Sequence, residues 1–570
     1  MTRRLPFDVR TLGGMVDFAA DRYPQATVGT ISTGDPLPYG ELAVRGRGIA
    51  RGLLAAGVAP GTAVAVLMSS GVELVQAVSG VAMAGAVVVP LPVPIVAGRA
   101  HLARLRHVIE DSGVRFAVVD DSFAEGLTDL LPALRTLPFS SLLGGGGTGD
   151  LPAVDPDDLA VVQYSSGSTS DPHGVELTHR NVLAGIRALQ HGTGVVGEDL
   201  LCHWLPLSHD MGLFSTLAAV GAGISIRTSS PQSFIKHPAD WLRRACDLRA
   251  TILVGPDSYY RYLVDAVPRD RVVEYDLSAV RVMINGAEPI DPVLVTGFAE
   301  HFAASGLATQ AMTPCYGLAE ATLAVTIAPS DSGPTVDWVD RDVLNIDGQA
   351  RAADPGAAGS RGVVNCGAPV PGVEVRIVED GRRLPDRVVG DIEIRGTPVM
   401  RGYRYESTPS VHPDGWCPTG DLGYLVDSCL HVTGRRKELL IIAGRNHYPQ
   451  DVEVAVRQVR GVHRERAVAT VLPADPPAGR PERICVLAEV ATPPAPSDDV
   501  VSGIREAAAG ELDGAGVDVV LVRRGALLRT TSGKYQRLSM RQQLLAGTLD
   551  GVLLHVPVDQ PVPQVVGSAP

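Results

Sequence analysis

Short β-rich runs recur along the first half of this 570-residue chain, and a stretch with a helical pattern follows each of them. These runs lie at 62–70, 115–121, 158–166, 250–256 and 280–289. Strands that alternate with helices at this spacing predict α/β layers built on a largely parallel sheet. The predicted fold class is therefore α/β, and the chain is long enough for more than one domain.

The uncharged stretch 74–98 is long enough to be compared with a membrane span. Its three prolines, Pro90, Pro92 and Pro94, would remove hydrogen bonds from the interior of a membrane helix. We therefore expect a helix that ends near Gly85, then a buried strand at 86–91, and no membrane span.

Charge and cysteine content narrow the possible functions. The formal net charge of -13 does not favour binding to nucleic acid or to an anionic membrane. The seven cysteines are scattered and form no CxxC pair, so neither a structural zinc site nor a disulfide framework is expected. Near the N-terminus, Pro6, Asp8 and Arg10 stand where a signal peptide needs an apolar core. A reducing, cytoplasmic location is the expectation.

The character of the sequence changes twice further along the chain. Turns between short strands are expected at 362–402, which predicts a β-rich subdomain at about 362–434. After Arg435 a strand, a loop and a helix precede further β-rich runs, which predicts a small α+β domain. The predicted units are an N-terminal domain at 1–434, a C-terminal domain at 435–550 and a proline-rich tail at 551–570.

A loop rich in Gly and hydroxyl side chains, 164–174, directly follows one of the β-rich runs. Its backbone N–H groups and its Ser and Thr hydroxyls could bind phosphate oxygens. The GxxxxGK[ST] pattern of a P-loop is absent, since no Lys follows Gly167 or Gly174. For this segment taken alone, a solvated linker is the alternative.

Further motifs follow this loop in a fixed order. They are WLPLSHDMGL (204–213), INGAEPI (284–290), PCYGLAEAT (314–322), the segment 418–453 with TGD and GRNHYPQDVE, and RTTSGK (529–534). Together they resemble the adenylate-forming superfamily of acyl-CoA synthetases, luciferases and peptide-synthetase adenylation domains, and in detail its fatty acyl-AMP ligase branch. The resemblance covers about 10–545. It implies a large N-terminal domain of layered α/β subdomains with a β-rich subdomain, and a small mobile α+β C-terminal domain.

The resemblance also implies a reaction, in which a carboxylate attacks the α-phosphate of ATP and gives acyl-AMP and pyrophosphate. Two anions must meet, so positioning and charge stabilisation would dominate catalysis. Glu320 would bind Mg²⁺ through oxygen, as suits a hard cation that bridges phosphates. Arg435 would contact the ribose and phosphates, and Lys534 would reach the α-phosphate as a mobile charge. These three residues are the predicted catalytic set.

Other residues are implied as contacts of the nucleotide. They are Ser165, Ser166, Gly167, Ser168 and Thr169 at the pyrophosphate, Gly286, Ala287 and Glu288 at the adenine, Tyr316 and Gly317 where the base stacks, and Asp421 at both ribose hydroxyls, together with Arg435 and Lys534. Taken singly, Tyr316 could be core packing, Asp421 a turn residue and Lys534 part of a surface turn. Where the family's phosphate loop often carries Lys, this sequence has His173, to which no catalytic role is assigned.

The acyl substrate is expected beside the motif at 204–213. The predicted substrate-binding residues are Trp204, His209, Leu213, Val254 and Tyr259. A general base made of His209 and Asp210 is the alternative, but adjacent side chains rarely face each other, and no GxSxG nucleophile accompanies them. Asp210 is therefore expected to be structural. The hinge between the two domains is placed at Lys437.

For the second half of the reaction, the resemblance implies transfer of the acyl group to the phosphopantetheine thiol of an acyl carrier protein. The long polar segment 328–362 lies where this branch carries an insertion that packs between the domains and limits the rotation that CoA transfer requires. Trp338, Val339, Val343 and Leu344 could dock it, with a surface loop as the alternative. The rival functions are an acyl- or aryl-CoA synthetase and a catalytically silent adenylate-binding paralogue.

Overall fold

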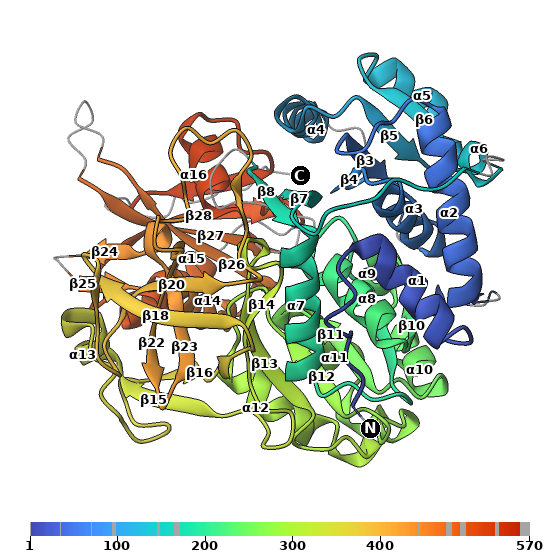
Figure 1. Cartoon of the computed structure of the whole chain (residues 1–570). Helices are drawn as coiled ribbons and strands as arrows, with labels where there is room; N and C mark the ends of the chain where they lie inside the picture. The colour runs from blue at the N-terminus through green and yellow to red at the C-terminus, as the bar shows by residue number, and fades with distance from the viewer. Residues whose placement is uncertain are drawn as a thin grey trace, which may run out of the picture.

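The first β-rich runs form a sheet of largely parallel strands (Figure 1). The computed structural model describes residues 2–32, 34, 36–69, 71–93, 99–144, 149–164, 172–442, 445–474, 481–490, 498–529 and 535–558. In order across this sheet the strands are β21 (Gly402–Tyr403), β8 (Gly174–Thr178), β7 (Leu159–Tyr164), β4 (Val87–Pro90), β3 (Ala63–Leu67), β5 (Phe116–Val119) and β6 (Arg135–Pro138). Pairing is antiparallel at β21, β8 and β7 and parallel from β7 to β6.

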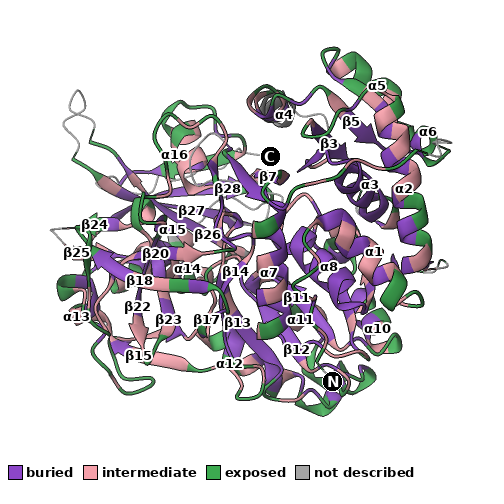
Figure 2. Cartoon of the chain, viewed as in Figure 1, coloured by how far each residue is buried: buried purple, intermediate pink, exposed green. Residues whose placement is uncertain are grey.

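The apolar runs of this sheet are buried, as Figure 2 shows for its strands. Every residue of β3 and β4 is buried, which is typical of a parallel sheet covered on both faces. The expected helix and strand at 74–91 are confirmed, because α3 spans Val72–Met83 and β4 follows it. Within the described part of the chain, no helix is long and apolar enough to cross a membrane.

The later β-rich runs form a second sheet. Its strands in order are β17 (Ala368–Pro369), β14 (Ala324–Ile327), β13 (Met312–Gly317), β12 (Val282–Asn285), β11 (Ile252–Gly255), β9 (Leu200–His203), β10 (Ser225–Thr228), β1 (Thr27–Thr30) and β2 (Leu37–Pro38). Pairing is parallel from β13 to β1 and antiparallel at both edges. The predicted α/β class with a largely parallel sheet is confirmed.

Helices connect these strands. They are α1 (Leu12–Arg22), α2 (Tyr39–Ala55), α4 (Arg99–Ser112), α5 (Ala124–Leu130), α6 (Phe139–Leu143), α7 (His179–Gly192), α8 (Asp210–Ala222), α9 (Pro231–Lys236), α10 (Pro238–Asp247), α11 (Asp257–Ala266) and α12 (Pro292–His301). Helix α7 contacts β7 and β8 of the first sheet and β14 of the second, so it lies between the two sheets (Figure 1). A capping box of Thr178 and Asn181 fixes where it begins.

An antiparallel sheet follows, where short strands and turns were expected. Its strands in order are β19 (Arg382–Arg383), β18 (Val373–Glu379), β20 (Gly390–Gly396), β22 (Cys417–Val426) and β23 (Cys429–Arg435). The last two strands carry the residues of the predicted ribose site.

The long polar segment at 328–362 is structured. It forms β15 (Val336–Asp340), α13 (Arg341–Asp347) and part of β16 (Ser360–Val364), and the two strands pair antiparallel. Val339 and Leu344 are buried in one cluster with Tyr424 of β22 and with Tyr448 further along the chain. Two of the four predicted residues, Val339 and Leu344, therefore dock the hairpin, while Trp338 and Val343 are half-buried and lie outside this cluster. The alternative of a surface loop is wrong.

The C-terminal part has its own sheet and its own buried clusters. Its elements are β24 (Leu440–Ile442), β25 (Arg445–His447), α14 (Pro449–Arg457), β26 (Val462–Leu472), β27 (Arg483–Val490), α15 (Asp498–Glu511), β28 (Val517–Arg523), α16 (Arg537–Leu545) and β29 (Val552–Val556). One expectation is corrected here. The segment 551–570 does not begin as a tail, because β29 pairs with β28 through apolar residues such as Val556.

Candidate active site

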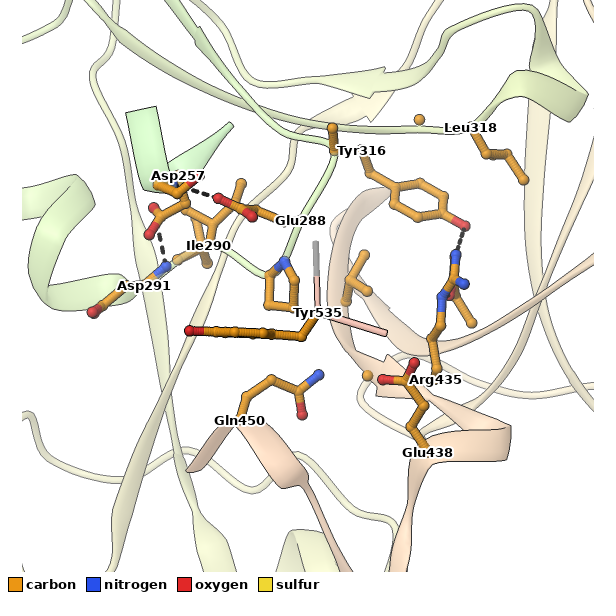
Figure 3. Close-up of a pocket in the computed structure, with 18 of the residues that line it drawn as sticks. Asp257, Glu288, Ile290, Asp291, Tyr316, Leu318, Arg435, Glu438, Gln450 and Tyr535 are labelled. Carbon is orange, nitrogen blue, oxygen red and sulfur yellow. Dashed lines mark hydrogen bonds and ion pairs between the residues drawn. The ribbon is translucent and has the colours of Figure 1, made fainter. Parts of the chain in front are cut away.

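A cavity of about 1110 Å³ lies between the second sheet and the C-terminal part (Figure 3). Ligands of open α/β sheets bind at the carboxyl ends of the strands, and Glu288 and Tyr316 reach the cavity from the ends of β12 and β13. The antiparallel sheet contributes Asp421, and the C-terminal part contributes Gln450 and Tyr535. The cavity thus joins motifs from three separate parts of the sequence.

Asp421 holds a hydrogen-bonded group at one side of the cavity. Its Oδ2 accepts a hydrogen bond from the hydroxyl of Tyr316 at 2.7 Å, and its Oδ1 accepts one from Nε of Arg435 at 2.9 Å. The Asp421 carboxylate raises the pKa of Arg435, and burial raises the pKa of Tyr316 well above its usual value. In Figure 3, Tyr316 points toward Arg435. Asp421 therefore contacts both Tyr316, from the motif at 314–322, and Arg435, from its own segment 418–453.

The predicted adenine segment follows β12. A Cβ at Gly286 would lie 2.5 Å from Sγ of Cys315, so this position needs glycine for the close approach to β13. Ala287 lines the cavity with a left-handed backbone, at φ 69°. Glu288 also lines the cavity, but its carboxylate accepts a hydrogen bond from the backbone N–H of Ser258 at the start of α11. That carboxylate therefore caps a helix, and only the backbone of the segment is left to approach a base.

The metal-binding role predicted for Glu320 rests on a single carboxylate. Glu320 lines the cavity, and its Oε1 accepts a hydrogen bond from the Tyr403 hydroxyl at 2.6 Å. Burial, with the nearby Glu320 charge, raises the pKa of Tyr403 above its usual value. Among the described residues, no three His, Cys, Asp or Glu side chains gather as a metal site. Glu320 thus fits a cation that takes its other ligands from phosphates and water, as Mg²⁺ usually does.

The arrangement of His209 and Asp210 differs from the expectation that their adjacent side chains do not face each other. Nδ1 of His209 lies 2.6 Å from Oδ1 of Asp210, so these adjacent side chains do face each other. The physical reason is that His209 is the N-cap of α8: its Nδ1 accepts a hydrogen bond from the backbone N–H of Met211, which also donates one to Oδ1 of Asp210. Both side chains line the cavity. His209 is therefore held at the cavity wall by the first turn of α8.

The other predicted acyl-binding residues are placed in the core. Trp204, Leu213, Val254 and Tyr259 are all buried and are not among the residues that line the large cavity. Trp204 stacks on Phe234 with ring centroids 4.6 Å apart, and Phe234 also packs on Tyr259. The motif at 204–213 thus brings His209 to the cavity, while these aromatic side chains form a packed layer behind it.

Several predicted residues lie outside the described residues. They are Ser165, Ser166, Gly167, Ser168 and Thr169 of the phosphate loop, and Lys534 of the C-terminal loop. The residues that flank these two segments, Tyr164 and Tyr535, both line the cavity. The predicted hinge residue Lys437 and the tightly packed Gly317 line it as well.

The structure also brings forward residues to which the sequence motifs gave no role. Arg361, Thr433 and Gln450 line one corner of the cavity, and each has a buried polar atom without a protein partner. On another wall, Asp257 is buried beside Glu288 and Asp291, and burial followed by these charges raises its pKa to about 7. Thr433 and Gln450 lie within the motif segment 418–453. Only tertiary packing gives these residues their neighbours in the cavity wall, so the local sequence held no signal for this arrangement.

Comparison of the sequence with known proteins identifies the family to which the chain belongs. The model of the AMP-binding enzyme family matches residues 16–404. A long-chain-fatty-acid–AMP ligase of Mycolicibacterium smegmatis, FadD32, is 32% identical over 90% of this chain and 89% of its own. The medium-chain-fatty-acid–[acyl-carrier-protein] ligase JamA of Moorena producens is 32% identical over 85% of this chain and 86% of its own.

Solved structures give the same result for the fold. A structure from studies of the fatty acyl-adenylate ligases of E. coli and L. pneumophila superimposes with a TM-score of 0.87 and 31% identity. The match covers 95% of this chain and 98% of that one. The adenylate-forming fold expected from the motifs is thereby confirmed. The chain belongs to the AMP-binding enzyme family, and within it to the fatty acyl-AMP ligase branch that its motifs predict.

Proposed function

We propose that this protein uses ATP to convert a fatty acid, or a related carboxylic acid, into acyl-AMP and pyrophosphate. The observation that carries the proposal is the contact of Tyr316, Asp421 and Arg435 at one wall of a cavity that Glu320 also lines. A ribose requires a carboxylate that accepts hydrogen bonds from its hydroxyls, a phosphate requires a positive charge, and a purine requires an aromatic ring on which it can stack. Relatives named as fatty-acid–AMP ligases support the same reaction.

Each residue of the cavity has a distinct task in this proposal. Asp421 accepts hydrogen bonds from the ribose hydroxyls, and the Arg435 that it holds places positive charge beside the phosphates. His209, held by the backbone N–H of Met211 at the start of α8, lies where the acid's carboxylate would approach. Lys534 and the loop 165–169 are assigned to the phosphates from the sequence motifs. Positioning of two anions, rather than a protein nucleophile, is the source of catalysis.

Mg²⁺ is the proposed metal cofactor, held through Glu320 whose orientation Tyr403 fixes. When bound, such an ion would neutralise charge on the phosphate oxygens. The single carboxylate at this position supports a metal shared with the nucleotide rather than a metal held by the protein alone.

We further propose that the acyl group passes to the phosphopantetheine thiol of an acyl carrier protein. The hairpin β15–α13–β16 supports this acceptor because it ties the N-terminal part to the C-terminal part. Arg341 pairs with Glu511 of α15, and Nε of Arg361 lies 3.0 Å from a carboxylate oxygen of Asp451 in α14. The Arg361 guanidinium also lies 4.0 Å from the centre of the Tyr448 ring.

These contacts would oppose a rotation of the C-terminal domain, 435–550, about the hinge at Lys437. Transfer to CoA requires that rotation, so the hairpin favours a carrier-bound thiol as the acceptor. The name of the relative JamA, an acyl-carrier-protein ligase, points the same way. An acyl-CoA synthetase is the second candidate.

All seven cysteines are unpaired, which supports a reducing, cytoplasmic location.

An ATP–pyrophosphate exchange assay tests the first step without any acceptor. We expect exchange that depends on both Mg²⁺ and a carboxylic acid. Tight ATP binding with no exchange for any acid would instead indicate a silent adenylate-binding paralogue.

A further inference from the structure

The wall that the C-terminal part contributes to the large cavity holds a buried ion-pair network centred on Arg537, the first residue of α16. Nη1 of Arg537 donates a hydrogen bond to Oε2 of Glu438 at 2.8 Å. Its Nε and Nη2 donate to the two carboxylate oxygens of Glu453 in α14, at 2.8 Å each. The side chains of all three residues are at most 10% exposed. Arg537 thus joins α16 to α14 and to the residue that directly follows the proposed hinge, Lys437.

In the sequence, Arg537 follows Lys534, the residue that the motifs assign to the α-phosphate, by three positions. The residues that flank the segment 530–534, Arg529 and Tyr535, form an antiparallel β-bridge. Their side chains also meet, because the Arg529 guanidinium lies 4.2 Å from the centre of the Tyr535 ring and donates a hydrogen bond to its hydroxyl. Both side chains line the cavity. Arg537 therefore lies two residues beyond a bridge that is fixed at the cavity wall.

One of the two carboxylates that bind Arg537 is itself attached to the sheet of the C-terminal part. Oε1 of Glu453 also accepts a hydrogen bond from the backbone N–H of Ala469 in β26, at 3.0 Å. A buried ion pair contributes little net stability compared with apolar side chains of the same size, so stability alone does not explain a network of this extent. A planar guanidinium with two carboxylates, in contrast, fixes orientation as well as distance. The network therefore suits the task of holding α16, and the chain before it, in one place.

We propose that Arg537 is a positioning residue, which holds the chain at the place from which Lys534 can reach the α-phosphate. A lysine side chain is flexible, so the place that its charge can reach depends on where its backbone is anchored. The hydrogen bonds of Arg537 to Glu438 and Glu453 supply that anchor. Asp421, the proposed ribose contact, belongs to β22 and not to this network. Loss of the anchor should therefore slow acyl-AMP formation more than it weakens ATP binding. This inference rests on the proposed function and adds a positioning residue to it.

Arg537→Lys is the first test, because it keeps a positive charge beside the two buried carboxylates and removes the planar set of donors. In the ATP–pyrophosphate exchange assay we expect kcat to fall at least about tenfold, while KM for ATP stays within about threefold of the wild type. A smaller fall in kcat, or a rise in KM alone, would overturn the positioning role and leave the proposed function intact.

Arg483→Lys is the matched control. The Arg483 side chain is 12% exposed, lies 2.9 Å from a carboxylate oxygen of Asp518 in β28, and is not among the residues that line the cavity. This variant makes the same chemical change in the same sheet, so it should lower the melting temperature and leave kcat within about threefold of the wild type. Equal losses of kcat in the two variants would show that Arg537 only stabilises the fold.

A double-mutant cycle tests whether Arg537 acts through Lys534. In Lys534→Ala the charge that Arg537 would position is absent, so adding Arg537→Lys should lower kcat by no more than about threefold further. A larger further loss would show that Arg537 acts independently of Lys534 and would overturn the proposal. If Arg537→Lys does not fold, Glu438→Gln weakens one of the two carboxylate contacts and enters the same cycle. A wild-type enzyme that shows no exchange with any acid would instead overturn the proposed function, and this inference with it.

Discussion

Replacement of Asp421 with Asn tests whether this carboxylate binds ATP directly or only stabilises the fold. In the wild type, the carboxylate holds Tyr316 at 2.7 Å and Arg435 at 2.9 Å, and it is the proposed acceptor of the ribose hydroxyls. A hydrogen bond to a charged group contributes about 1.5–3 kcal/mol. Asn loses the charge and turns one acceptor oxygen into a donor. We therefore expect a loss of about 3 kcal/mol, which is roughly 100-fold in affinity for ATP.

The chain offers a closely matched control for this substitution. Asp337 of β15 accepts a hydrogen bond from the Tyr424 hydroxyl at 2.8 Å and also pairs with Arg387, at 3.1 Å. It is not among the residues that line the cavity. Asp337→Asn thus makes the same chemical change in a carboxylate that also binds one Tyr and one Arg. It should lower the melting temperature by about as much as Asp421→Asn does, while its affinity for ATP stays within about threefold of the wild type.

Titration calorimetry with ATP, together with thermal melting of the three proteins, gives both quantities. An Asp421→Asn enzyme that binds ATP within threefold of the wild type would refute the ribose role. Equal weakening of ATP binding by Asp337→Asn would show that the effect is a general loss of structure and not a local loss of contacts.

Three further outcomes follow from the cavity and its motifs. Lys534→Ala should lower acyl-AMP formation at least ~100-fold without changing the melting temperature, since a charge at a transferring phosphoryl group contributes several kcal/mol; near-normal exchange would remove Lys534 from the catalytic set. Glu320→Gln should shift the Mg²⁺ titration of the exchange reaction to higher concentration, and an unchanged titration would assign the ion to another ligand. The third outcome is the pH dependence of the folding stability that Asp257→Asn changes. Burial raises the pKa of Asp257 from 3.8 to about 7, so the folded protein loses stability as pH rises between these values. The melting-temperature gain from Asn should therefore be larger at pH 8 than at pH 5, and a gain independent of pH would contradict the shift.

The features that could be predicted from sequence are those carried by local patterns. Runs such as 62–70 and 280–289 identify the parallel strands because apolar residues in strands buried on both faces are consecutive. The motifs also identify Tyr316, Asp421 and Arg435. The fold brings Tyr316 into contact with Asp421 across 105 residues of sequence, and Arg435, 14 residues after Asp421, contacts the same carboxylate.

The features that could not be predicted depend on what a side chain meets in space. Trp204 and Tyr259 belong to a motif-rich region, yet both pack in an aromatic layer that only tertiary structure defines. Tyr403, which orients Glu320, lies 83 residues from it along the chain. The contact of His209 with Asp210 depends on where α8 begins, and helix boundaries are among the least certain features of a sequence-based reading.

The identity of the acyl acceptor is the most direct test of the proposed function as a whole. Acyl-AMP is first formed on the enzyme with a carboxylic acid that supports ATP–pyrophosphate exchange, and equal amounts of CoA or of phosphopantetheinylated carrier protein are then supplied. Thioester products are followed by mass spectrometry. Because the hairpin at 336–364 ties the C-terminal part in place through Arg341 and Arg361, we expect acyl-carrier thioester and little or no acyl-CoA. Acyl-CoA formed as fast as the carrier thioester would contradict the proposed role of the hairpin and identify the enzyme as an acyl-CoA synthetase.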